Sequence, residues 1–276
     1  MTPDPTPFAD LLSARTRDAE RVKFDVPADW LQGRTAYGGL IAAIAAQAML
    51  DVAGAEWPPE VRLRSLQTNF VGPVTAGAAT VAVQLLREGK SVRQVQASVS
   101  SQGQLAATLV GVYGSARATA LETLAPTRPV VARSAEAAPS RAFVPGVMPG
   151  FLQHFDLGWA EGDPPLSGGK GWATSLYVRL AGDRAGEVDK DVLTVLLADA
   201  PPTPAISHFR QPTQASSVTW ALELLALDGP VAAEDWWRID THTRSARAGY
   251  VNHSSTLWMA AGEAAAFGHQ LVTVYG

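Results

Sequence analysis

Two parts of the chain run through the same order of predicted elements, and this repeat is the feature that most constrains the fold. Residues 110–114 (VGVYG) and residues 272–276 (VTVYG) close the two parts with nearly the same sequence. Before each ending, the hydrophobic periodicity indicates an apolar helix and then strands of period two joined by short turns. One helix followed by an antiparallel meander, present twice, predicts an α+β fold built from two tandem units.

The first part contains a run that is apolar on every side. It covers residues 40–52, follows Gly38 and Gly39, and consists mostly of Ala, Leu, Ile and Met. A helix that is apolar on all faces is a buried helix. Alternation of apolar and polar residues then predicts four strands joined by hairpin turns. These strands are expected over residues 63–71, 80–87, 92–100 and 105–113.

The second part repeats this order. Its first strand is expected over residues 171–180 and its helix over residues 188–200, where Pro201 stops the helix. Four further strands are expected over residues 217–225, 236–243, 250–259 and 266–275. Asp228-Gly229 and Ala261-Gly262 supply turns between them.

A segment rich in Ala, Pro, Ser and Arg separates the two parts, and it sustains no apolar period. Such a composition is typical of a linker that crosses a surface. We therefore predict an N-terminal unit over residues 1–114, a linker over residues 115–149 and a C-terminal unit over residues 150–276. The net charge of −4 and all five histidines belong to the residues after 114.

Composition excludes several classes of protein. The chain has no cysteine, which rules out disulfides and a thiolate nucleophile. Its 47% hydrophobic against 17% charged residues exclude general disorder, and its negative charge argues against nucleic-acid or anionic-membrane partners. The longest apolar stretch is too short to cross a bilayer, and the first residues do not resemble a signal peptide, so a cytoplasmic protein is expected. His253 and His269 lack the helical spacing of a metal pair, so no metal site is expected.

A long central helix wrapped by an antiparallel sheet, duplicated in one chain, resembles the double hotdog fold of the acyl-CoA thioesterase II-like family. The resemblance covers nearly the whole chain and implies that the two sheets form one continuous sheet. It also implies an Asp late in the second helix, a Thr or Ser on the next strand and a Gln on the last strand. The residues that match are Asp199, Ser217 and Gln270.

The resemblance implies hydrolysis of an acyl-CoA to a carboxylic acid and coenzyme A by an activated water. Asp199 is then the general base, and the hydroxyl and amide side chains hold the water. The best-known members have Thr where this chain has Ser217. Thr219 is a rival for the role, because side chains two residues apart on a regular strand share a face.

Three further expectations concern substrate binding and the first unit. Gly38 and Gly39 open a helix whose unpaired amides could form an oxyanion hole. Arg244 and Arg247 could contact the phosphates of coenzyme A. Thr108 lies at the same offset from the shared ending as Gln270, so the first unit is expected to lack a complete triad.

Two alternatives to hydrolysis stay open at the level of sequence. One is a protein that binds acyl-CoA without turnover. The other is a hotdog enoyl-CoA hydratase or dehydratase, which depends on a His paired with an acidic residue, whereas the first unit contains no His. The resemblance further implies a homodimer or larger homo-oligomer and no cofactor beyond the coenzyme A of the substrate.

Overall fold

The computed structural model describes residues 4–140, 142–182, 184–225, 231–232 and 235–275. The strands before residue 115 are β1 (Thr16–Asp18), β2 (Arg21–Val26), β3 (Leu31–Gln32), β4 (Thr35–Ala36), β5 (Arg62–Phe70), β6 (Gly77–Glu88), β7 (Val92–Ser101) and β8 (Gln104–Gly114). The strands after residue 150 are β9 (Phe155–Gly162), β10 (Ala173–Leu180), β11 (Ala215–Leu224), β12 (Trp237–Arg247), β13 (Tyr250–Trp258) and β14 (Ala264–Val274). The predicted strands are confirmed, with boundaries displaced by a few residues.

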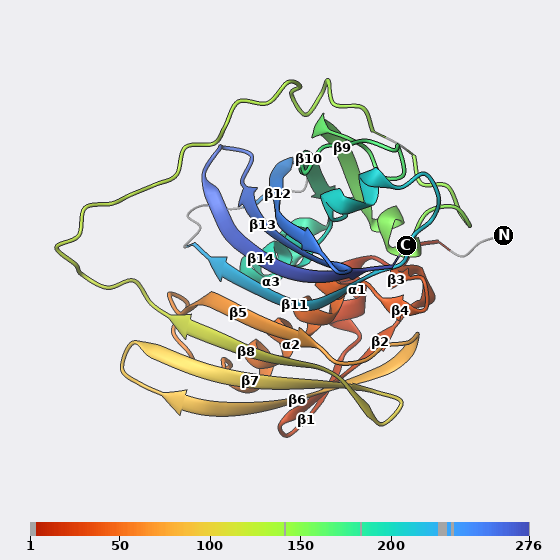
Figure 1. Ribbon diagram of the computed structural model, residues 1–276. Coiled ribbons are helices and arrows are strands. Elements are labelled where there is room, and N and C mark those ends of the chain that lie inside the picture. The colour runs from red at the N-terminus through yellow and green to blue at the C-terminus, as the bar shows by residue number, and fades with distance from the viewer. Residues whose placement is uncertain (1–3, 141, 183, 226–230, 233–234, 276) are drawn as a thin grey trace.

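Twelve of these strands form one antiparallel sheet in the order β1-β2-β6-β7-β8-β5-β11-β14-β13-β12-β10-β9, while β3 and β4 pair separately (Figure 1). The two units meet where β5 pairs with β11. Leu66 lies opposite Leu222 at the centre of this joint, and Thr68 lies opposite Trp220. The prediction of one continuous sheet is confirmed.

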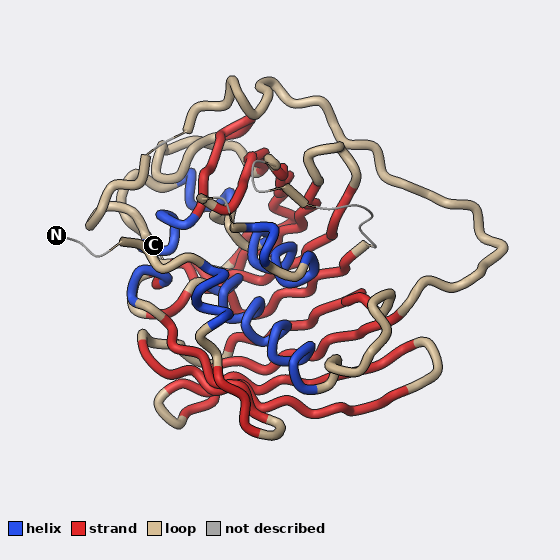
Figure 2. The backbone as a smooth tube through the Cα atoms, turned by 180° about the vertical axis from the view of Figure 1, so that it is seen from behind, coloured by secondary structure: helices blue, strands red, loops and turns tan. Residues whose placement is uncertain are grey.

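The helices lie together on one side of the curved sheet (Figure 2). The α-helices are α1 (Phe8–Ser13), α2 (Gly38–Val52) and α3 (Lys190–Ala198). The short 3-10 helices are η1 (Ala28–Trp30), η2 (Gly150–His154), η3 (Ala185–Glu187) and η4 (Pro204–His208). Within the described residues, no helix combines the length and the apolar character that crossing a membrane would need.

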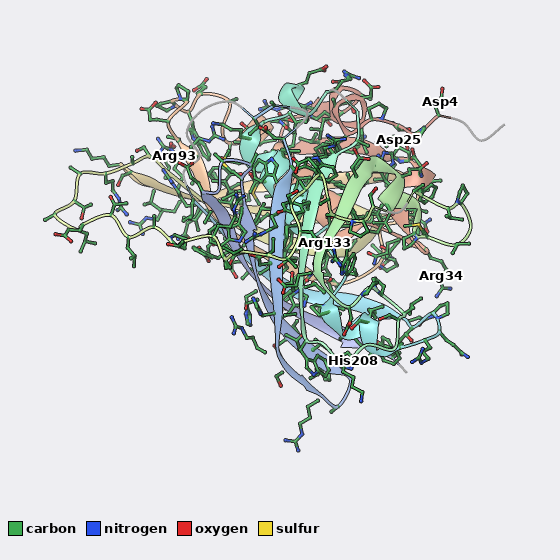
Figure 3. The ribbon with its side chains drawn as sticks, turned by 90° about the horizontal axis from the view of Figure 1, so that it is seen from above. Asp4, Asp25, Arg34, Arg93, Arg133 and His208 are labelled. Carbon is green, nitrogen blue, oxygen red and sulfur yellow. The ribbon has the colours of Figure 1, made fainter. Side chains whose placement is uncertain are left out.

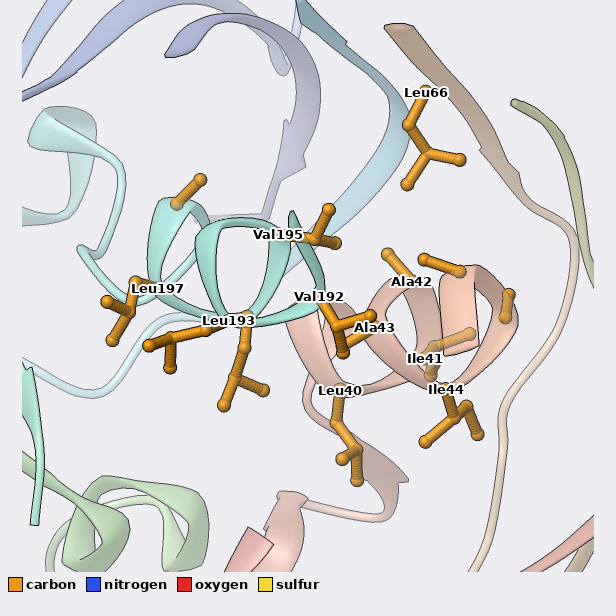
Figure 4. Close-up of a cluster of buried hydrophobic side chains, with 14 of the residues drawn as sticks. Leu40, Ile41, Ala42, Ala43, Ile44, Leu66, Val192, Leu193, Val195 and Leu197 are labelled. Atoms are coloured by element: carbon orange, nitrogen blue, oxygen red, sulfur yellow. The ribbon is translucent and has the colours of Figure 1, made fainter. Parts of the chain in front are cut away.

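The core is built where α2 packs against α3 and both face the sheet (Figure 4). Leu40 and Ile44 of α2 are buried beside Val192 of α3, and Leu66 of β5 is buried with them in the same core. Burying each such aliphatic side chain contributes about 1.5–3 kcal/mol relative to leaving it exposed. Because α2 is enclosed on all its faces, the prediction of an apolar buried helix is confirmed.

The second helix is shorter than predicted. It begins at Lys190, because the Asp189 side chain caps it by accepting hydrogen bonds from the amides of Asp191 and Val192 at 2.8 and 3.3 Å. It ends at Ala198, with Asp199 as the C-cap residue ahead of Pro201. This places Asp199 just past the helix end and not inside it.

Several elements were not predicted, namely α1 and the outer strands β1, β2 and β9. The burial of β2 alternates strictly, with Val22, Phe24 and Val26 buried and the residues between them exposed. β1 and β9 form the two edges of the sheet, and β2 lies between β1 and β6. The predicted turn at Asp228-Gly229 lies outside the described residues.

The segment between Gly114 and Gly150 forms no named helix or strand within its described residues. It swings out from β8 and then crosses over the C-terminal unit (Figure 1). The Arg133 carbonyl accepts a hydrogen bond from the Tyr177 hydroxyl at 3.2 Å, and Arg133 lies over the C-terminal strands (Figure 3). Ser140 forms an isolated bridge with Gly158.

A buried ion pair lies under this segment, on the face of the sheet away from the helices. Arg238 and Asp240 have side-chain exposures of only 3% and 8%, and Arg238 Nη2 donates to Asp240 Oδ2 at 2.8 Å. Trp258 Nε1 donates to the same oxygen at 2.7 Å, and Arg238 also donates to the Pro129 carbonyl. The pair therefore ties the covering segment to the C-terminal half of the sheet.

Candidate active site

Asp199, Ser217 and Gln270 come together from three elements of the C-terminal unit. Asp199 follows α3, Ser217 lies on β11 and Gln270 lies on the neighbouring strand β14. Gln270 Nε2 donates to Asp199 Oδ1 at 2.9 Å and to Ser217 Oγ at 2.8 Å. Both hydrogens of the amide are used in this way, so a single side chain fixes the spacing between the carboxylate and the hydroxyl.

The carboxyl of Asp199 lies at the start of α2. The pKa of Asp199 is raised to about 7, because burial disfavours the charged form more than the hydrogen bonds from Gln270 and the Gly39 amide favour it. The helix start also favours a negative charge. Both protonation states are therefore populated near neutral pH, as a group that accepts and then returns a proton requires.

The glycines that open α2 allow this approach. A Cβ atom on Gly38 would lie 2.8 Å from Asp199 Oδ2, so the carboxyl can lie here only if residue 38 has no side chain. The Gly39 amide already bonds to Asp199, and this differs from the predicted role of that amide in an oxyanion hole. For Gly38 the oxyanion role stays a prediction.

Thr219 does not share a face with Ser217, and the expectation that it does is wrong. The register of β11 against β14 shifts between these residues, because Val218 forms a bulge: Ser217 lies opposite Val272, whereas Thr219 lies opposite Leu271. One extra residue in a strand reverses the side to which the following residues point. Thr219 is consequently exposed on the outer face, away from Gln270.

His253 lies next to the triad and was not predicted as part of the site. It is the cross-strand partner of Gln270, and the two side chains are equally buried. Burial lowers the pKa of His253 to about 4, and an interaction with the Gln270 side chain acts against that effect. The turn at Ala261-Gly262 could have revealed this neighbour, because residues 253 and 270 are equally distant from its centre.

The equivalent place in the N-terminal unit is apolar. The register of β5 shifts between Leu63 and Ser65, as that of β11 shifts between Ser217 and Thr219. Aligning the two shifts makes Leu66 the counterpart of Trp220, and their partners on the next strands, Gly111 and Gln270, are then counterparts. A Cβ atom on Gly111 would lie 2.8 Å from Met49 Sδ and 3.0 Å from the Tyr113 ring. These two side chains fill the space that the polar triad has in the C-terminal unit.

Thr108 is therefore not the counterpart of Gln270, and the assignment by sequence offset is wrong. Its neighbours alternate in burial along β8, and Thr108 is on the outer face, only partly buried. The shared endings of the two parts differ in structural register by three residues, because Val272 and not Tyr275 occupies the place of Tyr113. The expectation that the first unit lacks the triad still agrees with the apolar side chains found there.

The two candidate phosphate contacts lie toward the end of β12. Arg244 Nε donates to Ser254 Oγ at 2.7 Å, and Arg247 lies beside the exposed turn that leads to Tyr250. Both are exposed. A contact with coenzyme A by either residue stays a prediction.

The geometry first defines a class of protein: a tandem hotdog protein with an acid, an amide and a hydroxyl joined in its second unit. The sequence matches the acyl-CoA thioesterase N-terminal domain over residues 26–120 and the acyl-CoA thioesterase C-terminal domain over residues 129–274. The chain belongs to the acyl-CoA thioesterase family and is a thioester hydrolase.

Solved structures show the same fold. A hotdog protein of unknown function from Alicyclobacillus acidocaldarius has a TM-score of 0.80 and 18% identity, with 99% of each chain covered. An acyl-CoA thioesterase II from Mycobacterium marinum has a TM-score of 0.71 and 15% identity, covering 97% of this chain and 96% of that one. A dehydratase domain from Pseudomonas fluorescens has a TM-score of 0.58 and 12% identity, covering 96% and 98%. These identities are too low to carry an activity from a neighbour to this chain. No curated protein matches the sequence significantly.

Proposed function

We propose that this protein hydrolyses acyl-CoA thioesters through a water activated by Asp199 and held by Ser217, while Gln270 fixes the positions of these two side chains. The observation that carries the proposal is the double hydrogen bond from one amide group to a carboxyl and a hydroxyl. Membership of the acyl-CoA thioesterase family supports the substrate class. The coenzyme A is part of the substrate, and the proposed chemistry uses side chains and water. A homo-oligomer and a cytoplasmic location stay predictions.

The three side chains suit the steps of hydrolysis. Gln270 donates to Ser217 Oγ, which leaves the hydroxyl hydrogen of Ser217 free to donate to a water. The ionised Asp199 takes a proton as the water oxygen bonds to the thioester carbon. The tetrahedral intermediate then breaks its carbon–sulfur bond, and the proton on Asp199 passes to the leaving sulfur. The products are a carboxylic acid and the thiol of coenzyme A.

Thiol release from a panel of acyl-CoAs of different chain lengths tests the function. We expect release with at least one substrate, with a rate that rises with pH through about 7, because the ionised form of Asp199 is the active one. Binding without thiol release from any chain length would instead support an acyl-CoA-binding protein. Hydration of an enoyl-CoA with no thiol release would support the hydratase alternative.

The bulge in β11 provides a matched pair of variants. Ser217→Ala is expected to lower kcat/KM by about 10- to 100-fold, because the water loses a hydrogen-bond partner in the transition state. Thr219→Val, which removes an exposed hydroxyl on the other face, is expected to stay within about twofold of wild type. Equal effects of the two substitutions in the thiol assay would contradict the assignment of Ser217.

A further inference from the structure

The orientation of the Gln270 amide decides whether the triad is assembled. As observed, the NH2 group faces Asp199 and Ser217, and both of its hydrogens are used. A rotation by half a turn would place the amide oxygen there instead. That flipped amide would repel an ionised Asp199 but would accept a hydrogen bond from a protonated one.

Protonation of Asp199 makes the flipped state accessible. Because the pKa of Asp199 is about 7, a large share of the molecules carry the proton near neutral pH. In those molecules the carboxyl can donate to the amide oxygen, which would stabilise the protonated form further. A site with this arrangement therefore needs a group that binds the Gln270 amide oxygen on the side away from Asp199 and Ser217.

His253 is in the place from which such a group would act. Directly opposed residues on antiparallel strands have neighbouring side chains, and His253 lies opposite Gln270 on the inner face. Each is 7% exposed, and an interaction joins the imidazole to the Gln270 side chain. Burial keeps the imidazole neutral above about pH 4, so it offers one N–H donor throughout the range in which Asp199 titrates.

Among the described residues, His253 Nδ1 is buried without a hydrogen-bond partner, so the interaction with Gln270 falls to His253 Nε2. Thr243 Oγ1, opposite His253 on the other neighbouring strand, is likewise buried without a partner among these residues. Two further titratable groups lie near Asp199 and His253. Tyr37, at the start of α2, has its pKa raised well above the usual value by burial and by Asp199, so it stays neutral. His269 faces away on the outer side of β14 and slightly opposes a charge on His253.

We propose that His253 is a positioning residue that donates a hydrogen bond to the Gln270 amide oxygen and so keeps the amide NH2 directed at Asp199 and Ser217. This inference rests on the proposed function of the triad. It assigns to His253 neither proton transfer nor contact with the thioester. Its consequence is that His253 lowers the pKa of Asp199 by denying the protonated carboxyl its alternative partner.

His253→Phe tests this role, because Phe keeps an aromatic ring but has no donor. In a plot of kcat against pH, we expect the acidic limb to move to higher pH by somewhat less than one unit. This shift is equivalent to the loss of about one hydrogen bond. The rate should then fall about threefold at pH 7 and less than about twofold at pH 9, with little change in KM. His269→Phe, the same substitution on the outer face, is the matched control and should follow the wild-type profile.

Two further variants and one titration complete the test. An amide side chain restores a donor. His253→Asn or His253→Gln should therefore bring the acidic limb of the plot of kcat against pH back toward its wild-type position. A rate lowered by one factor at every pH, or an unchanged profile, would overturn the positioning role. If the wild type releases no thiol, the proposed function fails, but the carbon-13 titration of Asp199 still decides the inference: its pKa should be higher in His253→Phe, and an equal pKa would overturn it.

Discussion

Replacing Asp199 by Asn is expected to reduce thioester hydrolysis by about 1,000-fold or more, because an amide cannot take the proton from the attacking water. The amide oxygen of Asn can still accept the hydrogen bond that Gln270 donates to Asp199 Oδ1. The side chain is also similar in volume, so it fits beside Gly38. The loss should therefore appear in kcat, measured by thiol release under saturating acyl-CoA.

The difference in stability between this variant and the wild type depends on pH, and its sign follows from the raised pKa of Asp199 in the wild type. The pKa of Asp199 is about 7 in the folded protein against its usual value of 3.8, so the folded state holds the proton more tightly. Stability from this group is therefore present at low pH and is lost as pH rises from about 4 to about 7, by on the order of 1.4 kcal/mol per pKa unit. Asn does not ionise and is free of this loss.

The melting temperature of Asp199→Asn relative to wild type should therefore increase between pH 5 and pH 8. Asp25→Asn, which changes an exposed carboxylate on β2, is the control for both assays and should leave activity and melting temperature nearly unchanged. Activity of Asp199→Asn within a few-fold of wild type would show that Asp199 is not the base. A melting difference that is flat with pH would contradict the raised pKa.

Asp240→Ala is expected to give the largest loss of stability. It leaves the Arg238 guanidinium buried under the covering segment without its carboxylate, and it removes the acceptor of the Trp258 indole. Breaking a buried ion pair on one side costs about 3–5 kcal/mol. For a chain of this size that lowers the melting temperature by roughly 10 °C.

Two variants separate this effect from a general sensitivity to lost carboxylates. Asp156→Ala breaks a much more exposed pair with Arg179 and should cost about 0–1 kcal/mol. The double change of Arg238 and Asp240 to Leu removes both charges and should recover a large part of the loss. Equal melting temperatures for Asp240→Ala and Asp156→Ala would mean that the buried pair does not anchor the segment. The activity of the Asp240→Ala protein that is still folded should match wild type, because the Arg238–Asp240 pair lies on the face of the sheet away from the helices.

The sequence predicted the elements that carry strong periodicity. The apolar run that became α2 could only be a buried helix, and the alternation in β7 and β8 required strands with one face in the core. β2 has the same alternation, with three buried residues between exposed ones, but it spans only six residues and lies before the repeated order of one helix and a strand meander.

The sequence grouped Asp199, Ser217 and Gln270 as one candidate site, and the structure brings these side chains into contact, but the strand register around them could not be predicted, for a physical reason. Strand register is set by pairing across the sheet, and a bulge of one residue leaves no mark in the hydrophobic pattern of Ser217 to Thr219. Thr108 lies three residues from Gly111, the counterpart of Gln270, because the similar endings of the two units do not occupy matching positions in the sheet. His253 shows the converse case, because its neighbour could have been found by counting outward from a turn that was already predicted.

The most direct test of the account is a single turnover in water enriched in oxygen-18, with the protein in excess over an acyl-CoA that it hydrolyses. Direct attack by an activated water predicts that the thiol is released and that the acid formed in this first turnover carries one labelled oxygen. Unlabelled acid would show that an oxygen of the protein, and not water, attacks the thioester. That result, or the absence of thiol release with every acyl-CoA tried, would contradict the assignment of Asp199, Ser217 and Gln270 as a water-activating site.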